Sequence, residues 1–386
     1  MYILQTDSCC SNGELIQGLN IVVEGNRIHS LEKAAGEKTA AIETVDLRGL
    51  YVFPGFLDIH VHGGAGFDVM DASFEALDAI SRHKLEEGVT SFCPTTVTAS
   101  LERIHAALDS VRDASDRGVT GARIIGAFLE GPYISPLFKG AHPEEHIRGI
   151  ALAEIQALID RGQGHIASVA IAPEKPLALD AIRLLRDNNI VARLGHSAAD
   201  CAETLAGIEA GGCIAIHTYN AMSPFSPRAP GMTGAVLTHD GVYNEIICDF
   251  IHTDPLAVKL LYKAKTAEKV ILITDCMRAG GMADGDYTLG EMNVLVRDGV
   301  ARTESGALAG STLTLLRAVK NMHSTGVPLE KAAQMATDTP ARALGLFNEL
   351  GSIDIGKRAD IIAVDKEFSL RFVMMDGVIK KRAEAA

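Results

Sequence analysis

Eight short apolar segments, separated by stretches with helical spacing, constrain the fold of this chain more than any other feature. Parallel strands need long crossover connections, usually helices, so the alternation predicts parallel βα units. Eight such units over roughly 300 residues predict a (β/α)8 barrel. A doubly wound open sheet is the alternative, although no G-x-G-x-x-G follows an early segment. The expected strands span residues 56–62, 89–95, 123–130, 166–172, 190–196, 213–219, 244–251 and 269–275.

The stretches that separate or follow these strands have the apolar spacing of a helix with one buried face. The main expected helices span residues 73–87, 151–161, 177–188, 199–210, 255–267 and 311–325. No low-complexity linker and no repeat beyond the βα unit interrupts the pattern. We therefore expect residues 54–350 to form a barrel domain.

The two ends of the chain follow a different pattern. Short β-like runs punctuated by glycine occupy residues 1–53, and similar runs occur at 359–365 and 370–375. A long helical period is missing from residues 1–53. We expect residues 1–53 and 351–386 to combine into one small β-sandwich domain.

Composition excludes several classes of protein. Apolar residues make up 47% of the 386 residues and charged residues 22%, which is ample for a large core and excludes a disordered chain. The net charge of -13 argues against nucleic-acid and membrane partners. The chain has no long apolar run and no signal-peptide pattern. Its seven cysteines, without a C-x-x-C, fit reduced thiols and a cytoplasmic location.

Imidazole and carboxylate side chains lie at or near the ends of most of the expected strands. In a (β/α)8 barrel the catalytic residues come from the C-terminal strand ends. Each residue alone has an ordinary explanation, such as a turn carboxylate or a helix cap. Together they indicate a metal-dependent site. The residues are His60, His62, Glu130, His196, His217, His252 and Asp275.

Nitrogen and oxygen ligands of this kind fit zinc or another borderline divalent metal such as iron. Glu130, His196 and His217 would leave a coordination position open for water, whose pKa the metal lowers toward neutral. Asp275 would then be the general base that takes a proton from the water and passes it to a leaving amine. The i, i+2 spacing of His60 and His62 places both rings on one strand face, where they can share a metal.

The order H-x-H, L-E-G-P, G-H-S, H-x-x-N-A-M and T-D resembles the amidohydrolase superfamily, and the fuller strings resemble its N-acetylglucosamine-6-phosphate deacetylase family. The resemblance covers essentially the whole chain. The strings are P-G-F-L-D-I-H-V-H-G (54–63), P-T-T (94–96), F-L-E-G-P-Y (128–133), K-G-A-H (139–142), G-H-S (195–197), H-T-Y-N-A-M-S-P-F (217–225), R-A-P-G (228–231), I-T-D (273–275), L-A-G-S-T-L (308–313), P-A-R-A-L-G (340–345) and G-K-R-A-D (356–360).

The resemblance implies a (β/α)8 barrel with a small β-sandwich, and hydrolysis of the acetamide of N-acetylglucosamine 6-phosphate. It implies that the triad of Glu130, His196 and His217 binds the principal metal, zinc or iron. A second metal would be held by the H-x-H pair with Glu130 bridging, so that one or two ions bind per chain. Asp275 matches the catalytic aspartate, and His142 matches a histidine that polarises the acetamide carbonyl.

The resemblance also implies how the sugar phosphate is bound. Arg228 and His252 match phosphate ligands that reach the site from the neighbouring subunit of a homodimer. The chain departs from the family pattern at Phe250, where glycine is expected, and at Cys276, where alanine is expected; both bear on substrate breadth. The residues expected to hold the sugar are Ala141, Asn220, Ala221, Leu308, Ala309 and Gly310.

Other functions fit the residues less well. Cyclic-amide hydrolases and deaminases of the same superfamily often use a carboxylated lysine between two metals, but no lysine ends an expected strand. A barrel that binds a sugar phosphate without catalysis would not need the complete set of ligands and Asp275. A glycoside hydrolase would leave the histidines unexplained, and a serine hydrolase would need a G-x-S-x-G.

Overall fold

The computed structural model describes residues 1–33 and 43–382; residues 34–42 and 383–386 of the predicted terminal domain lie outside the described residues. The predicted barrel is confirmed, because eight strands follow one another in chain order as parallel neighbours. Its strands are β6 (Phe56–Val61), β9 (Val89–Thr96), β11 (Ala127–Leu129), β12 (Ile166–Ile171), β13 (Val191–Leu194), β14 (Ile214–Ala215), β15 (Tyr243–Ile247) and β16 (Val270–Ile273).

The barrel closes between β6 and the chain that follows β16. Asp275 N donates to His60 O at 3.0 Å, and His62 N donates to Cys276 O at 2.8 Å. The segment predicted as the third strand is divided into β10 (Arg123–Ile124) and β11. Gly126 lies between them at a φ of +111°, a backbone conformation that interrupts the ladder.

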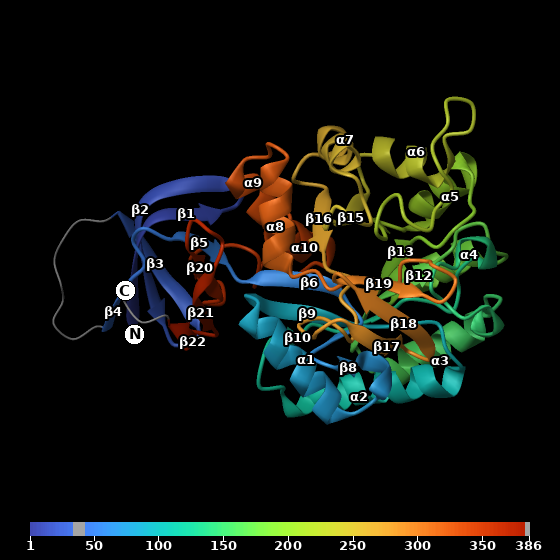
Figure 1. Cartoon of the computed structure of the whole chain (residues 1–386), viewed down its shortest axis with the longest axis horizontal. Helices are drawn as coiled ribbons and strands as arrows, with labels where there is room; N and C mark the ends of the chain where they lie inside the picture. The colour runs from blue at the N-terminus through green and yellow to red at the C-terminus, as the bar shows by residue number, and fades with distance from the viewer. Residues whose placement is uncertain (34–42, 383–386) are drawn as a thin grey trace.

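Helices cover the outside of the barrel, as Figure 1 shows. Ser73, Ser100 and Asp200 accept hydrogen bonds from the first turns of α1, α2 and α5, so polar residues fix where these helices begin. The α-helices are α1 (Phe74–Glu86), α2 (Leu101–Arg117), α3 (Leu152–Gly162), α4 (Ala178–Asp187), α5 (Cys201–Ala210), α6 (Gly231–Thr238), α7 (Pro255–Lys265), α8 (Leu315–Ser324), α9 (Leu329–Gln334) and α10 (Asp338–Ala343).

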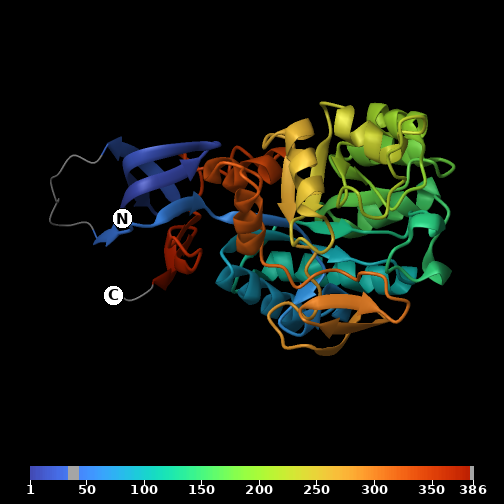
Figure 2. The same ribbon diagram turned by 45° about the horizontal axis from the view of Figure 1, so that its top comes forward.

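The two ends of the chain form one mixed sheet beside the barrel (Figures 1 and 2). The strand order β22-β21-β20-β5-β1-β2-β3, with β4 on β1, joins strands from both termini. A second, smaller apolar core lies against it and includes Leu4, Ile21, Ile361 and Phe372. The strands are β1 (Tyr2–Ser11), β2 (Glu14–Glu24), β3 (Arg27–Lys33), β4 (Glu43–Asp46), β5 (Tyr51–Pro54), β20 (Ile361–Val364), β21 (Leu370–Met375) and β22 (Val378–Arg382).

A three-stranded antiparallel sheet follows β16 and was not among the expected elements. It comprises β17 (Gly285–Leu289), β18 (Met292–Arg297) and β19 (Val300–Thr303). Leu289 at its first turn and Leu308 just beyond it line the main cavity of the barrel mouth. Shorter elements are β7 (Gly63–Gly64), β8 (Phe67–Asp68), η1 (Val69–Asp71), η2 (Pro136–Phe138) and η3 (Glu144–His146).

The large core lies between the barrel strands and the helices and contains most of the buried apolar side chains. None of the helices within residues 1–33 and 43–382 combines the length and apolar character needed to cross a membrane.

Candidate active site

The predicted site residues follow the barrel strands directly. His60 lies in β6, Glu130 follows β11, and His196, His217 and Asp275 each follow a strand after one intervening residue. The last three have positive φ angles of 46°, 27° and 51°, a conformation that costs a non-glycine residue free energy. Backbone hydrogen bonds hold these turns in place, so the strand ends turn their side chains toward one another.

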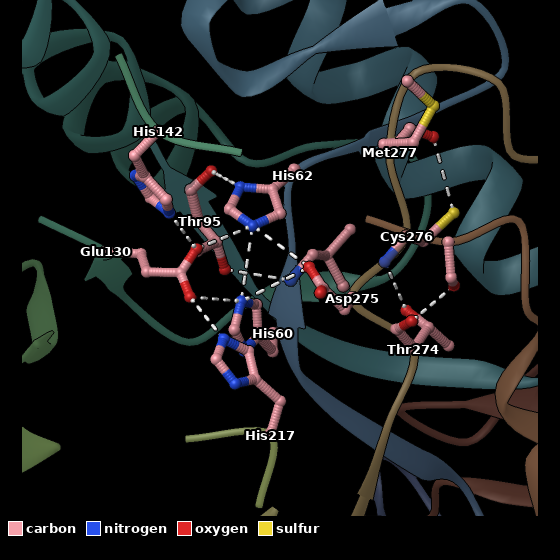
Figure 3. Close-up of polar contacts among 12 residues, drawn as sticks. His60, His62, Thr95, Glu130, His142, His217, Thr274, Asp275, Cys276 and Met277 are labelled. Atoms are coloured by element: carbon pink, nitrogen blue, oxygen red, sulfur yellow. Dashed lines mark hydrogen bonds and ion pairs between the residues drawn. The ribbon is translucent and has the colours of Figure 1, made fainter. Parts of the chain in front are cut away.

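Glu130 lies at the centre of the site, with its carboxylate surrounded by imidazole rings (Figure 3). Its Oε1 lies 3.3 Å from His196 Nε2 and 3.2 Å from His217 Nε2, and these two nitrogens are 3.0 Å apart. Two ligands of one tetrahedral zinc, each about 2.0–2.1 Å from the ion, lie ~3.3 Å apart. The predicted principal triad therefore has the spacing of three ligands of a single cation.

The H-x-H pair forms a second cluster with Asp275. The Nε2 atoms of His60 and His62 lie 3.3 Å apart, and Asp275 Oδ1 lies 3.5 Å and 3.2 Å from them. Asp275 Oδ1 is buried and has no hydrogen-bond partner within residues 1–33 and 43–382. Glu130 also contacts this cluster, at 3.4 Å from His60 and 3.0 Å from His62. A carboxylate between two clusters is the arrangement that a bridging ligand needs.

The four rings predicted as ligands all have an acceptor at Nδ1. His62 donates to Thr95 O at 3.1 Å, His196 to Phe138 O at 2.8 Å, and His217 to Asn220 O at 3.2 Å. The Nδ1 of His60 lies 3.1 Å from the carboxylate of Glu245. Because carbonyl and carboxylate oxygens only accept, the neutral rings carry their proton on Nδ1 and expose a Nε2 lone pair to the site.

The Nδ1 atom of His142 accepts a hydrogen bond, whereas the Nδ1 atoms of the four ligand rings donate. The backbone N–H of Thr98 donates to its Nδ1 at 3.2 Å, and Thr98 Oγ1 lies 2.9 Å from the same atom. A neutral ring that accepts at Nδ1 carries its proton on Nε2, the atom 3.5 Å from Glu130 Oε2. Although Glu130, His142 and His196 lie close enough to hold a cation, this tautomer presents a donor to the cavity. His142 is therefore suited to polarise a carbonyl.

The charges of the two clusters differ. Burial favours the neutral ring of His60, but the carboxylates of Glu130 and Asp275 outweigh it and raise the pKa of His60 well above its ordinary value. The same balance raises the pKa of His62 to about 9. For Asp275, the nearby imidazoles overcome burial and lower the pKa to about 2. For His196, burial dominates and lowers the pKa to about 4.

A cavity of about 250 Å³ opens over the clusters. Most of the predicted sugar-binding residues line it, and Asn220 Nδ2 is buried there without a hydrogen-bond partner among the described residues. Ala309 is buried and is not part of the lining. The lining includes Ala141, His142, Asn220, Ala221, His252, Leu308 and Gly310.

The two predicted phosphate ligands lie in different places. His252 lines the cavity of its own chain, and its Nδ1 lies 2.7 Å from Asp249 Oδ2. The expectation that His252 reaches a neighbouring subunit is therefore wrong, because the turn after β15 directs it inward. Arg228 is exposed and lines a separate pocket with Asp200 and Pro230. Arg228 does not reach the site of its own chain.

Two buried charged residues beneath the site were missed by the sequence reasoning. Arg193 in β13 and Glu245 in β15 are completely buried and pair with each other. A signal was present, because Arg193 interrupts an otherwise apolar strand and Glu245 is the charged residue in a short strand that ends in two isoleucines. Their pairing could not be read from the sequence, since another strand separates β13 from β15.

A barrel with buried imidazole and carboxylate clusters at its C-terminal mouth defines a class of metal-dependent hydrolases. Residues 51–381 match the model of the amidohydrolase family, and the chain belongs to this family. The resemblance found in the sequence motifs is thereby confirmed.

Two relatives within the family are deacetylases of amino-sugar phosphates. The chain is 44% identical over 357 residues to N-acetylglucosamine-6-phosphate deacetylase of Vibrio furnissii, covering 92% of this chain and 89% of that protein. It is 46% identical over 325 residues to N-acetylgalactosamine-6-phosphate deacetylase of Escherichia coli O157:H7, covering 84% and 86%.

A solved structure extends this similarity to the fold. It is a mutant of the Mycobacterium smegmatis N-acetyl-D-glucosamine-6-phosphate deacetylase in complex with N-acetyl-D-glucosamine-6-phosphate. The two chains superpose with a TM-score of 0.91 at 32% identity, and 98% of each is covered.

Proposed function

We propose that this protein hydrolyses the acetamide of N-acetylglucosamine 6-phosphate, giving glucosamine 6-phosphate and acetate. The observation that carries the proposal is the set of four imidazole Nε2 atoms that converge on the buried carboxylate of Glu130, next to Asp275. The activity of the similar deacetylases supports the same reaction.

Asp275 and His142 have different roles in the proposed reaction. Asp275 is the general base, because its carboxylate is buried, ionised and lies beside the ligand clusters, with Oδ1 3.2 Å from His62 Nε2. It accepts a proton from the attacking water and returns it to the nitrogen as the C–N bond breaks. His142 donates a hydrogen bond from its Nε2–H to the acetamide oxygen, where negative charge develops, and keeps this proton throughout. The products are the free amine and acetate.

The ligand atoms fit a divalent cation, and zinc suits their nitrogen and oxygen donors best, with iron as the alternative. Glu130, His196 and His217 would hold the principal ion. His60 and His62, together with Glu130, would hold a second. A cation bound there supplies Lewis acidity to the carbonyl and lowers the pKa of water.

The phosphate binds to His252 of the same chain and to Arg228 of a second chain in a homodimer. Asp249 accepts hydrogen bonds from the backbone of Ile251 and His252 as well as lying against the His252 ring, so the turn is well fixed. Arg228 lies on an exposed loop next to Phe225, a residue that is 60% exposed. An exposed cation and an exposed aromatic ring are what a contact between two chains would cover.

The sugar is less tightly defined than the reaction, because the similar proteins include an N-acetylgalactosamine-6-phosphate deacetylase. We propose the gluco sugar as the preferred substrate, and cytoplasmic amino-sugar metabolism as the setting. Phe250 and Cys276 are the departures that bear on this preference. Phe250 has a positive φ of 65° in the turn that carries His252.

Acetate release tests the proposal directly. The protein loaded with zinc is expected to release one acetate for each primary amine formed from N-acetylglucosamine 6-phosphate. The same assay with N-acetylgalactosamine 6-phosphate and with unphosphorylated N-acetylglucosamine ranks the substrates. Absence of acetate from both phosphorylated sugars would refute the proposed reaction.

A further inference from the structure

A buried ion pair lies beneath the two ligand clusters and takes no direct part in the chemistry proposed above. Arg193 Nη1 donates to Glu245 Oε1 and, at 3.1 Å, to the backbone oxygen of Ile59. Both side chains are completely buried. Burying two charges costs free energy that hydrophobic residues of similar size would not cost, so stability alone does not explain the pair.

Glu245 contacts residues of both ligand clusters. Its Oε2 lies 3.1 Å from His60 Nδ1 and 3.4 Å from the backbone nitrogen of His217, which donates to it. The backbone oxygen of Glu245 also accepts from Thr218 N at 2.8 Å. One residue of β15 therefore supports a ring of the H-x-H pair and the turn that carries a ligand of the principal triad.

The ring of His60 is also held from another side. Phe128 meets it edge to face, with ring centroids 4.9 Å apart and planes at 89°. The guanidinium carbon of Arg193 lies 3.9 Å from the centroid of the same Phe128 ring. Arg193 therefore holds three neighbours of His60 in place. They are the carboxylate of Glu245, to which His60 donates, the ring of Phe128, against which His60 packs, and the backbone oxygen of Ile59, the residue before His60.

We infer that Glu245, aligned by Arg193, is the positioning residue that makes His60 a cation ligand by keeping its proton on Nδ1. His60 differs from His62, His196 and His217 because its Nδ1 partner is a side chain, whereas theirs are main-chain carbonyls. The inference rests on the proposed function in taking the clusters as cation sites. It extends that function by assigning a residue that controls the second site.

Glu245→Gln should reverse the tautomer of the His60 ring. Arg193 can only donate, so it keeps the amide oxygen of the new side chain facing itself. The amide NH2 group then faces His60 Nδ1, which must accept. The proton of His60 moves to Nε2, and this nitrogen loses the lone pair that a cation needs.

Zn²⁺ binding measured without substrate reports the effect of the substitution on the cation sites. Because no reaction takes place, the result does not depend on whether the protein is a deacetylase. The protein is stripped with a chelator and titrated with Zn²⁺, with ions per chain counted after equilibrium dialysis. Wild type is expected to take up two ions. In Glu245→Gln the second ion should bind about 10–100-fold more weakly, as losing an outer-shell partner does. The change for the first ion should be smaller, because the His217 ring keeps its acceptor Asn220 O and the bond from Thr218 N to the backbone oxygen of residue 245 is unchanged.

Glu87→Gln is the matched control, because Glu87 is also a largely buried glutamate paired with a buried cation, Lys84, at 3.1 Å. It contacts none of the ligand rings and should leave the second ion unaffected. Equal weakening in the two variants would overturn the inference. A wild-type chain that takes up one ion would overturn it as well.

A double-mutant cycle distinguishes positioning from general support. His60→Gln should remove the second ion, and adding Glu245→Gln to it should change nothing further, because Glu245 acts through His60. Additive losses would contradict this.

Should Glu245→Gln fail to fold, the tautomer can be read from wild type. In the zinc-loaded protein, ¹⁵N spectra of the imidazole rings are expected to show His60 protonated at Nδ1. Protonation at Nε2 would overturn the inference.

Discussion

The two ligand clusters share Glu130 but are supported by different parts of the molecule. His60 and His62 lie at the end of β6, in the barrel wall, and their rings are fixed by Glu245 and by the backbone of β9. His196 is held by Phe138 O, in the loop that also carries His142. The H-x-H cluster is therefore positioned by the barrel interior, whereas the principal triad depends on loops that line the substrate cavity.

The clusters also differ in the protons they hold without a cation. The pKa of His62 is about 9, so this ring is protonated at neutral pH, whereas the pKa of His196 is about 4 and that ring is neutral. A cation must displace protons from the H-x-H pair but finds His196 ready to bind.

Replacing Asp275 separates its chemistry from its place in the H-x-H cluster. Asp275→Asn should lower kcat by about 10²–10⁴-fold, because an amide cannot take the proton, while the principal cation and the substrate still bind. Steady-state acetate release and cation content measure both effects. Asp298→Asn makes the same change at an exposed aspartate with the same φ of 51° and should be neutral. Near-normal turnover of Asp275→Asn would remove its assignment as the base.

Replacing one ligand in each cluster tests whether the two clusters bind their cations independently and contribute unequally to activity. His196→Gln should weaken the principal ion by more than the roughly 10–100-fold expected for an outer-shell partner, and abolish most activity. His62→Gln should weaken the second ion and leave the first in place. Dialysis against buffered Zn²⁺ gives both affinities. Loss of both ions in each variant would mean that the clusters act as one site.

Arg228 tests whether the loop side of the site is completed by a second chain. Arg228→Ala should raise KM about 10–100-fold for the phosphorylated sugar, since a charged hydrogen bond is lost, and leave the unphosphorylated sugar unaffected. Mixing this variant with Asp275→Asn should restore activity, because a mixed dimer has one complete site. A mixture no more active than its parts would contradict a contribution from the neighbouring chain.

The pH dependence of cation binding sharpens the comparison further. As the pH falls below the His62 pKa of about 9, affinity for the second ion should fall about tenfold per pH unit for each proton displaced. His196 remains neutral above its pKa of about 4, so in the principal triad only His217, whose pKa nearby carboxylates raise, has a proton to lose, and the slope should be smaller. Zn²⁺ titrations between pH 6 and 9 measure both slopes. Equal slopes would show that the two clusters release the same number of protons when a cation binds, which contradicts the expectation.

Much of this architecture could be predicted from the sequence, because apolar strands and helical spacing carry the barrel pattern. The strands end earlier than predicted where ligands begin, since His196, His217 and Asp275 leave the ladder through positive φ angles. Within the β-like region 1–53 the bounds of β1 could not be predicted, because its polar stretch from Gln5 to Ser8 conceals a strand. β1 itself pairs with β2, β4 and β5, and β5 pairs in turn with β20 from the other end of the chain.

The ligand residues were predictable because their side chains interrupt apolar runs at strand ends. The tautomers were not, because they depend on carbonyls of residues such as Thr95 and Phe138 that carry no sequence signal. The location of Arg228 outside the cavity, and of His252 within it, depends on turns whose direction only the fold determines.

The central claim is that cations held around Glu130 enable the chain to hydrolyse the acetamide. Its most direct test is acetate release from N-acetylglucosamine 6-phosphate by the metal-stripped protein as Zn²⁺ is returned in measured equivalents. The account predicts negligible release without Zn²⁺ and a rise that follows occupancy of the site formed by Glu130, His196 and His217. Full activity in protein shown to contain no metal would contradict it.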